Sequence, residues 1–125
     1  MNFATVRLGE AEGALWVENE AIRIKVPSQI ATRLRGHMDE WAVLGIRPKD
    51  LRVASNTDTA DLSFEVEIEV VEKLGSEILL DVRAGASAMV AAVEPTIRAK
   101  VHDRLRLAVD VNRLHFFDHR SGVAI

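Results

Sequence analysis

Strict alternation of apolar and polar side chains between Leu62 and Val71 is the feature of this sequence that most limits its fold. Apolar side chains stand at positions 62, 64, 66, 68 and 70, and a serine and three glutamates stand between them. Successive side chains of a strand point to opposite faces, so the pattern predicts one buried and one solvated face. The segment is therefore predicted to be a half-buried strand.

Further strands and one helix are indicated along the rest of the chain. The same alternation recurs in 22–26 and 105–109. Glycine and proline turn signals separate six more predicted strands: Ala4–Leu8, Ala14–Glu18, Trp41–Arg47, Glu77–Arg83, Ala88–Val93 and Arg113–Phe117. A helix is predicted after Pro27, with Ser28 as its cap and Ile30, Leu34 and Met38 on one face. These elements predict an all-β fold with one short helix, arranged as a barrel or sandwich.

A polar, turn-rich interval at 54–61 divides the chain into two β-rich segments, about 1–53 and about 62–125. No internal repeat, low-complexity tract or flexible linker separates them. The 125 residues are enough for one hydrophobic core. We therefore expect a single domain over 1–125.

Composition restricts the partners and the compartment of the chain. No cysteine is present, which excludes disulfides and thiolate metal sites from this chain and permits a reducing cytoplasm. Sixteen basic and nineteen acidic residues give a net charge of −3, without the basic excess that nucleic-acid binding requires. No apolar run approaches the roughly 18 residues of a membrane span. We expect no nucleic-acid partner and no direct membrane insertion.

The sequence offers little for a nucleotide or a metal. It contains neither Gly-x-x-x-x-Gly-Lys-Ser/Thr nor Gly-x-Gly-x-x-Gly, the loops whose backbone amides hold phosphates. His115, Asp118 and His119 could converge on a metal at a strand end. The favoured interpretation places His115 on the polar face of a strand and the other two in the following turn. A metal-dependent enzyme using the two histidines is the remotest alternative.

Charged residues on two of the predicted strands have matching periodicity. Glu65, Glu67 and Glu69 would repel one another on one strand face unless cations stood on a neighbouring strand, and Arg104 and Arg106 have the spacing to do so. Cross-strand ion pairing is the favoured interpretation. An acidic docking patch for a basic partner is the alternative.

The two tryptophans, Trp16 and Trp41, are predicted to pack in the core. If either is exposed, it could stack on a sugar or a base. The alternation around each tryptophan does not decide whether its side chain points into the core or toward solvent.

Three segments together resemble one known family. They are Val-Leu-Gly-Ile-Arg-Pro-Lys-Asp-Leu-Arg-Val from Val43, Val-Val-Glu-Lys-Leu-Gly-Ser-Glu from Val70, and Arg-Leu-His-Phe-Phe-Asp from Arg113. In this order and spacing they resemble the C-terminal regulatory (TOBE, OB-type) domain of the ATPase subunit in ABC importers of the maltose and glycerol-phosphate type. Met1, Asn2 and Phe3 match the segment that follows the ATPase domain in that family. The family commonly has Glu at the position of Lys49 and Gly at that of His102.

The resemblance implies an OB-fold-like β-barrel built from two segments, and a regulatory and dimerisation function without catalysis. ATP and Mg²⁺ would be bound by a nucleotide-binding domain that this chain lacks, so no cofactor is expected on the chain itself. The implied partners are a second copy of the domain, transmembrane permease subunits and a cytosolic regulatory protein. The implied location is the cytoplasm, peripheral to the inner face of the plasma membrane.

Two of the shared segments supply the predicted interface residues. They are Arg47, Pro48, Lys49 and Asp50 after one strand and Gly75, Ser76 and Glu77 in a predicted hairpin turn. A different class of function stays open beside this one. Related β-barrels bind oxyanions such as molybdate, or small sugars, so the chain could instead be a ligand-binding module.

Overall fold

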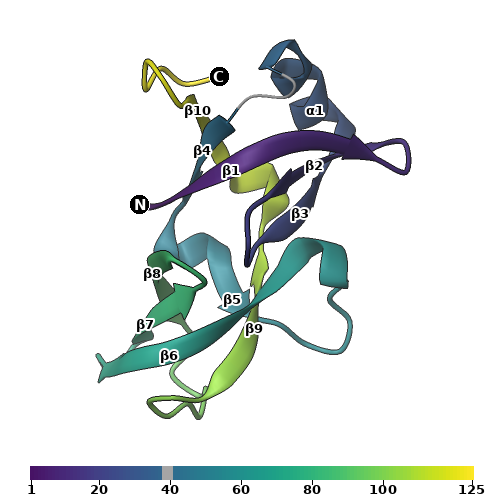
Figure 1. Ribbon diagram of the computed structural model, residues 1–125. Coiled ribbons are helices and arrows are strands. Elements are labelled where there is room, and N and C mark those ends of the chain that lie inside the picture. The colour runs from purple at the N-terminus through teal and green to yellow at the C-terminus, as the bar shows by residue number, and fades with distance from the viewer. Residues whose placement is uncertain (38–40) are drawn as a thin grey trace.

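The computed structural model describes residues 1–37 and 41–125 of the chain (Figure 1). Met38, the last residue of the predicted helical face, lies outside the described residues. The strands are β1 (Asn2–Ala11), β2 (Ala14–Glu18), β3 (Arg23–Val26), β4 (Trp41–Ile46), β5 (Leu51–Val53), β6 (Ser63–Lys73), β7 (Ile78–Ala84), β8 (Ser87–Val93), β9 (Arg104–Val109) and β10 (His115–Asp118). The helical elements are α1 (Ser28–Leu34) and the 3₁₀ turns η1 (Arg35–His37), η2 (Pro48–Asp50), η3 (Ala60–Leu62) and η4 (Val111–Arg113).

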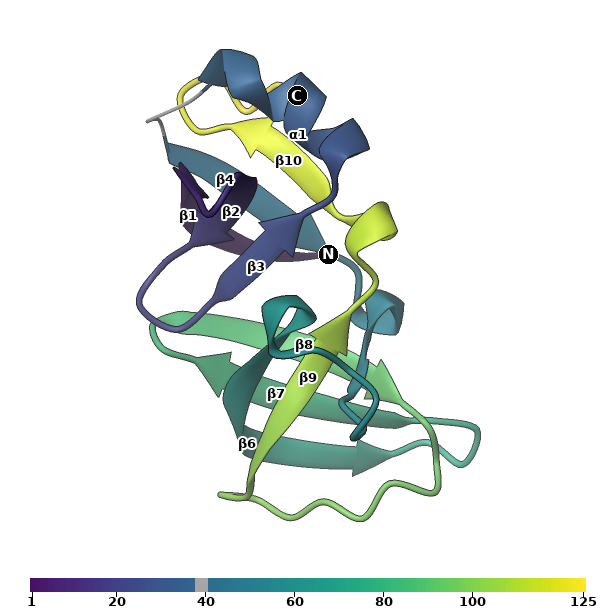
Figure 2. The ribbon, with the colours of Figure 1, turned by 90° about the vertical axis from the view of Figure 1, so that its right-hand side faces the viewer.

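The strands form two antiparallel sheets, which Figure 2 shows one above the other. Sheet A has the order β10-β4-β1-β2-β3, and sheet B has the order β5-β9-β6-β7-β8. Each half of the sequence gives one edge strand to the sheet of the other half, because β5 joins sheet B and β10 joins sheet A. The chain therefore crosses between the sheets twice, through η2 and through η4.

Alternation of side chains explains both sheets. In β1 the buried side chains of Ala4, Val6 and Leu8 alternate with exposed ones, and β6 buries Phe64, Val66 and Ile68 in the same way. The buried side chains of both sheets belong to one continuous core. The predicted fold class is confirmed, since the described part of the chain is mostly β, with two curled sheets and one short helix, as expected of an OB-like fold.

The outer face of sheet B carries the predicted ion pairs, with one change of partner. Arg104 reaches Glu65 at 3.0 Å and Glu67 at 3.6 Å. Glu69 is paired with Arg83 of β7 at 3.2 Å. The predicted cation Arg106 instead donates to Ser63, through Nε to the hydroxyl and through Nη2 to the carbonyl oxygen. These carboxylates therefore have cross-strand partners within the sheet, as cross-strand pairing requires.

The prediction that Ser28 caps the helix is wrong. Pro27 is the N-cap, with extended φ and ψ of −66° and 156°, and no side chain bonds to the open amides there. Ser28 already lies inside the helix, so its hydroxyl is past the position from which a cap bonds the first free amides. The Pro27 carbonyl oxygen accepts from the amides of Ile30 and Ala31.

One strand begins later than predicted, and one strand was not predicted. The expected strand over Arg113–Phe117 begins at His115, because η4 occupies 111–113 and the Asp110 carboxylate accepts from the Asn112 amide at its start. The alternation at 51–53 was too short to predict β5, which pairs with β9. Both differences fall beside the two crossings between the sheets.

Side chains and turns join the two sheets where they face one another. The Asn2 side chain of β1 donates to the Val90 carbonyl oxygen and accepts from the Val90 amide, each at 2.8 Å. The Glu20 carboxylate, in the turn between β2 and β3, accepts from the Ala86 amide in the turn between β7 and β8 at 3.0 Å. These two contacts fix β8 and its preceding turn against sheet A.

Candidate functional site

The predicted segment Arg47–Asp50 forms the first crossing between the sheets. Arg47 is extended, Pro48 opens η2, and the Asp50 amide donates to the Arg47 carbonyl oxygen at 2.9 Å. Proline suits this place because its fixed φ is compatible with the first residue of a helical turn and no amide is lost there. Arg47 and Lys49 are exposed, whereas Pro48 and Asp50 are half-buried.

This crossing is bonded to the other one. The Asp110 amide, just before η4, donates to the Asp50 carbonyl oxygen at 3.1 Å. η2 also packs against β8. A partner that displaces Arg47 or Lys49 would therefore act on the link between the sheets.

The predicted residues Gly75, Ser76 and Glu77 form the turn between β6 and β7. The Leu74 amide donates to the Glu77 carbonyl oxygen at 2.9 Å, and Gly75 has a φ of 86°. That φ lies in the left-handed region, which glycine adopts without the clash of a Cβ. The predicted tight hairpin is confirmed, and Figures 1 and 2 place its tip at an end of sheet B away from η2. The two predicted segments are therefore not brought together.

Exposed apolar side chains lie close to this hairpin in the sequence. Val70 of β6 and Leu74 at the turn are each 48% exposed. We call Val70 and residues 74–77 together the hairpin tip. Scattered exposed apolar residues are ordinary, but a set beside a projecting turn is available to a partner.

The outer face of sheet A carries exposed aromatic side chains that sequence reasoning missed. Phe3 is 56% exposed and Trp41 is 50% exposed. Phe117 packs edge-to-face on Phe3, with ring centroids 6.0 Å apart. The default expectation of core packing is thus wrong for Trp41 and right for Trp16, which is only 5% exposed. The alternation in β1 could have predicted the exposure of Phe3, because Phe3 lies on the opposite face of the strand from Ala4, Val6 and Leu8.

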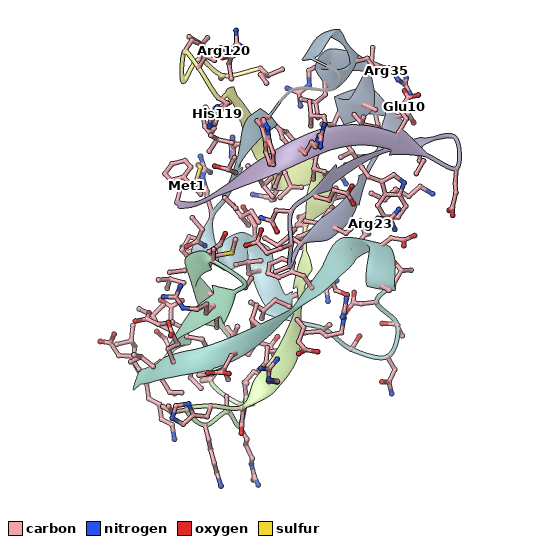
Figure 3. All side chains as sticks on the ribbon, in the orientation of Figure 1. Met1, Glu10, Arg23, Arg35, His119 and Arg120 are labelled. Carbon is pink, nitrogen blue, oxygen red and sulfur yellow. The ribbon has the colours of Figure 1, made fainter. Side chains whose placement is uncertain are left out.

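Trp16 has a cation on its ring. The Arg23 guanidinium carbon lies 3.8 Å from the ring centroid, a cation–π contact that covers the accessible side of the indole (Arg23 is labelled in Figure 3).

A second exposed cation, Arg35 of η1, pairs with Glu10 of β1 at 3.2 Å and holds the helical segment to sheet A. Both contacts are structural.

The histidines and carboxylate considered for a metal lie at the end of β10. Leu114 and Phe116 are buried and His115 is half-buried, so the predicted facing of this strand is confirmed. Asp118 Oδ1 accepts from the amides of Arg120 and Ser121 and orders the turn. His119 is exposed beyond the strand (Figure 3). In the described ranges 1–37 and 41–125, no three His, Asp or Glu side chains are grouped as metal ligands.

The polar interval 54–61 is an ordered loop built on Asp58. The Asp58 carboxylate accepts hydrogen bonds from both terminal nitrogens of Arg52. It also accepts from the Ser55 amide at 2.8 Å and the Ser55 hydroxyl at 3.2 Å. These donors lower the pKa of Asp58 well below its usual range, the hydrogen bond from Arg52 having the largest effect. The same pair raises the pKa of Arg52.

The fold defines a class, namely small OB-like β domains built from two curled sheets and a short helix. No helix among the described residues has the length and apolarity to cross a membrane. The sequence pattern of the TOBE domain matches residues 44–117. The chain belongs to the TOBE domain family.

The curated proteins to which the chain is similar are ATP-binding proteins of transporters. The chain is 30% identical over 128 residues to an uncharacterized ABC transporter ATP-binding protein of Bacillus subtilis, covering 100% of this chain and 35% of that protein. It is 27% identical over 127 residues to the oligosaccharides import ATP-binding protein of the same organism, covering 100% of this chain and 34% of that protein. The trehalose/maltose import ATP-binding protein of Thermococcus litoralis is 28% identical over 93 residues, which are 72% of this chain and 25% of that protein. The chain thus spans about a third of the length of the first two relatives.

Proposed function

We propose that this chain is a non-catalytic regulatory and dimerisation domain of an ABC sugar-importer ATPase. Membership of the TOBE domain family and similarity to import ATP-binding proteins support the proposal. ATP and Mg²⁺ would be bound by an ATP-binding region of the kind that the relatives' names describe, because this chain contains no phosphate-binding glycine loop. The parent subunit would work with permease subunits at the cytoplasmic side of the membrane.

The physical role of such a domain is to keep two ATPase subunits together. Two ATP-binding regions that close on ATP and separate after hydrolysis must meet again in each cycle. A standing contact elsewhere makes that meeting intramolecular and raises its effective concentration to the millimolar range for short links, as an order of magnitude. A regulator that binds the contact differently in the open and closed states would shift the cycle.

The hairpin tip is the observation that carries the self-contact. Val70 and Leu74 expose apolar surface beside a tight turn whose Gly75 and Ser76 leave room for close approach. Burial of such side chains favours association, against the cost of the translational and rotational freedom that two chains lose when they associate. We assign the self-contact to this tip.

The segment Arg47–Asp50 has a different part in the proposal. It lies apart from the hairpin tip, presents the exposed cations of Arg47 and Lys49, and is bonded to the second crossing. A cytosolic regulatory protein with an acidic surface would complement these charges. Its binding would act on the relation between the two sheets.

Sedimentation equilibrium of the purified chain tests the self-contact. The chain is expected to dimerise reversibly, and Leu74→Asp is expected to weaken dimerisation at least tenfold because it would bury a charge at the contact. Val123→Asp is the matched control, since Val123 is 64% exposed and stands two residues before the C-terminus, which Figure 1 shows at the opposite end of the molecule from sheet B. A monomer at all concentrations, or equal effects of both substitutions, would contradict the proposal.

A further inference from the structure

A cleft of about 440 Å³ lies between the outer face of sheet A and the turn that joins β7 to β8. Its aromatic lining comes from Phe3 and Trp41, and its polar lining comes from Thr5, Asn19, Glu20 and Ser87. Pockets for small ligands have volumes of about 300 to 1,000 Å³ and combine apolar walls with a few polar groups. The size suits a monosaccharide or a disaccharide.

The two aromatic side chains stand on one face because of the strand register. Phe3 lies opposite Gly45 and Arg7 lies opposite Trp41, with Thr5 between Phe3 and Arg7 on the same face of β1. Trp41 and Phe3 are each at least half exposed. The Arg7 guanidinium carbon lies over the Trp41 ring, 5.9 Å from its centroid, so a ligand would share that indole with a cation and pack on the exposed remainder of the two rings. The C–H groups of a sugar ring pack against such rings, because the aromatic face is apolar and carries partial negative charge.

The polar groups of the cleft are of two kinds. Asn19 and Glu20 are held in place by hydrogen bonds. The side-chain amide of Asn19 donates to the Thr5 carbonyl oxygen at 3.2 Å, and the Glu20 carboxylate accepts from the Ala86 backbone amide. Within the described part of the chain, the hydroxyls of Thr5 and Ser87 make no side-chain hydrogen bond. Asn19 Oδ1 already accepts from the backbone amides of Ala21 and Ile22, so Glu20 is the fixed acceptor of the cleft. A fixed carboxylate beside free hydroxyls matches a ligand with many hydroxyl groups, each of which both donates and accepts.

The charge of the cleft distinguishes a neutral ligand from an anionic one. Among the described residues that line it there is no lysine or arginine, and Glu20 is its carboxylate. Hydrogen bonds from the backbone amides of Glu20 itself and Ala86 lower the pKa of Glu20, so the carboxylate is charged at neutral pH. A phosphate or molybdate would meet the Glu20 carboxylate, whereas the cation of Arg7 lies over the Trp41 ring and is not among the described lining residues.

We propose that this cleft binds a neutral sugar or polyol, with Trp41 and Phe3 packing on the sugar ring and Thr5, Glu20 and Ser87 bonding its hydroxyl groups. The site shares no residue with the hairpin tip and goes beyond the proposed dimerisation. It would give an importer subunit a means of responding to free sugar on its own side of the membrane. Of the ligand classes considered from the sequence, the cleft fits the sugar and not the oxyanion.

Calorimetry and tryptophan fluorescence of the full chain test the site, with trehalose and maltose as neutral probes and sn-glycerol 3-phosphate as the anionic probe. Both sugars are expected to bind saturably and to change the emission of Trp41, because Trp16 is buried. Trp41→Ala is expected to weaken sugar binding at least tenfold. Trp41→Phe is expected to keep the affinity within about threefold, since it preserves the aromatic face.

Val123→Ala, which removes an exposed apolar side chain outside the cleft, is the matched control and is expected to leave binding unchanged. Ser87→Ala is expected to weaken binding less than Trp41→Ala does. The proposal is overturned if neither sugar binds saturably, if Trp41→Ala binds as the unaltered chain does, or if the phosphate compound binds more tightly than the sugars. None of these outcomes depends on whether the chain dimerises.

Discussion

Two residues other than glycine have backbone angles in the left-handed region among the described positions. Glu12 has a φ of 56° and His102 has a φ of 75°. Residues with a Cβ pay for this conformation through a clash with the neighbouring carbonyl oxygen. The backbone requirement at His102 also explains why glycine is the common residue there in the family that the sequence resembles.

His102→Gly is therefore expected to stabilise the chain. Removing the Cβ clash gains about 1 to 2 kcal/mol, part of which is offset by the greater freedom of glycine in the unfolded chain. The His102 side chain contributes little to stability. Its ionic contact with Glu67, at 3.7 Å, is exposed to water, since the His102 side chain is 84% exposed. A rise in the midpoint of urea unfolding would confirm this, and Glu12→Gly should change the midpoint in the same direction. A lower midpoint for His102→Gly would contradict it.

Asp58 is expected to make the 54–61 loop sensitive to acid. Its pKa is lower in the folded chain than in the unfolded chain, so it stabilises the fold above its unfolded pKa and loses this effect as the pH falls toward the folded pKa. Asp58→Asn should lower stability at pH 7 and flatten the decline of stability below about pH 4. Thermal unfolding from pH 7 to pH 2 measures both effects. Asp61→Asn, in the same loop, is the control, and an equally flattened profile for it would contradict this account.

At the scale of elements, two turns show how similar glycines differ in what surrounds them. Gly75 and Gly85 both have a positive φ, 86° and 59°. A Cβ on Gly75 would meet nothing within 4 Å, whereas a Cβ on Gly85 would lie 2.8 Å from the Ala21 Cβ and 2.9 Å from Glu20 Oε1. The turn between β7 and β8 is thus held tightly against the turn between β2 and β3.

Gly85→Ala is expected to destabilise the chain more than Gly75→Ala. Gly75→Ala measures the backbone cost alone, about 1 to 2 kcal/mol. Gly85→Ala adds the cost of overpacking, about 1 to 3 kcal/mol, because Ala21 and the Glu20–Ala86 contact must move. Chemical unfolding of both variants gives the difference. Equal losses would show that the two turns are not packed as described.

The sequence predicted the elements better than it predicted their partners. Alternation located most strands within a few residues, because burial of one sheet face forces a period of two. It could not predict that β5 and β10 exchange sheets, since a three- or four-residue strand has too little alternation to specify a neighbour. It also missed the exposure of Trp41, because facing on a strand depends on which side the other sheet covers. The cleft was beyond prediction for the same reason, since its walls come from four distant segments.

At the scale of the whole molecule, one side chain of β1, in sheet A, is bonded to β8, the edge strand of sheet B. Asn2 is only 8% exposed, and its amide makes both hydrogen bonds that a neighbouring strand would make to Val90. These bonds satisfy an edge that would otherwise expose unpaired backbone groups. Asn2 therefore acts as a one-residue extension of sheet B.

Asn2→Ala is expected to destabilise the chain by about 1 to 3 kcal/mol, because it leaves the amide and the carbonyl oxygen of Val90 unpaired in a partly buried place. Hydrogen exchange at the Val90 amide should become faster than in the unaltered chain. Asn112→Ala, at an exposed turn, is the control and should change neither quantity by much. Unchanged exchange at Val90 would contradict the link.

The proposed contact between two copies at the hairpin tip is tested most directly by disulfide crosslinking, because the chain has no cysteine of its own. A Ser76→Cys variant places one thiol in the tip, and Ser121→Cys places one thiol in the exposed turn after β10. The account predicts that mild oxidation joins the Ser76→Cys chains into a covalent dimer and leaves Ser121→Cys largely monomeric. Failure of Ser76→Cys to crosslink, or crosslinking of both variants to the same extent, would contradict it.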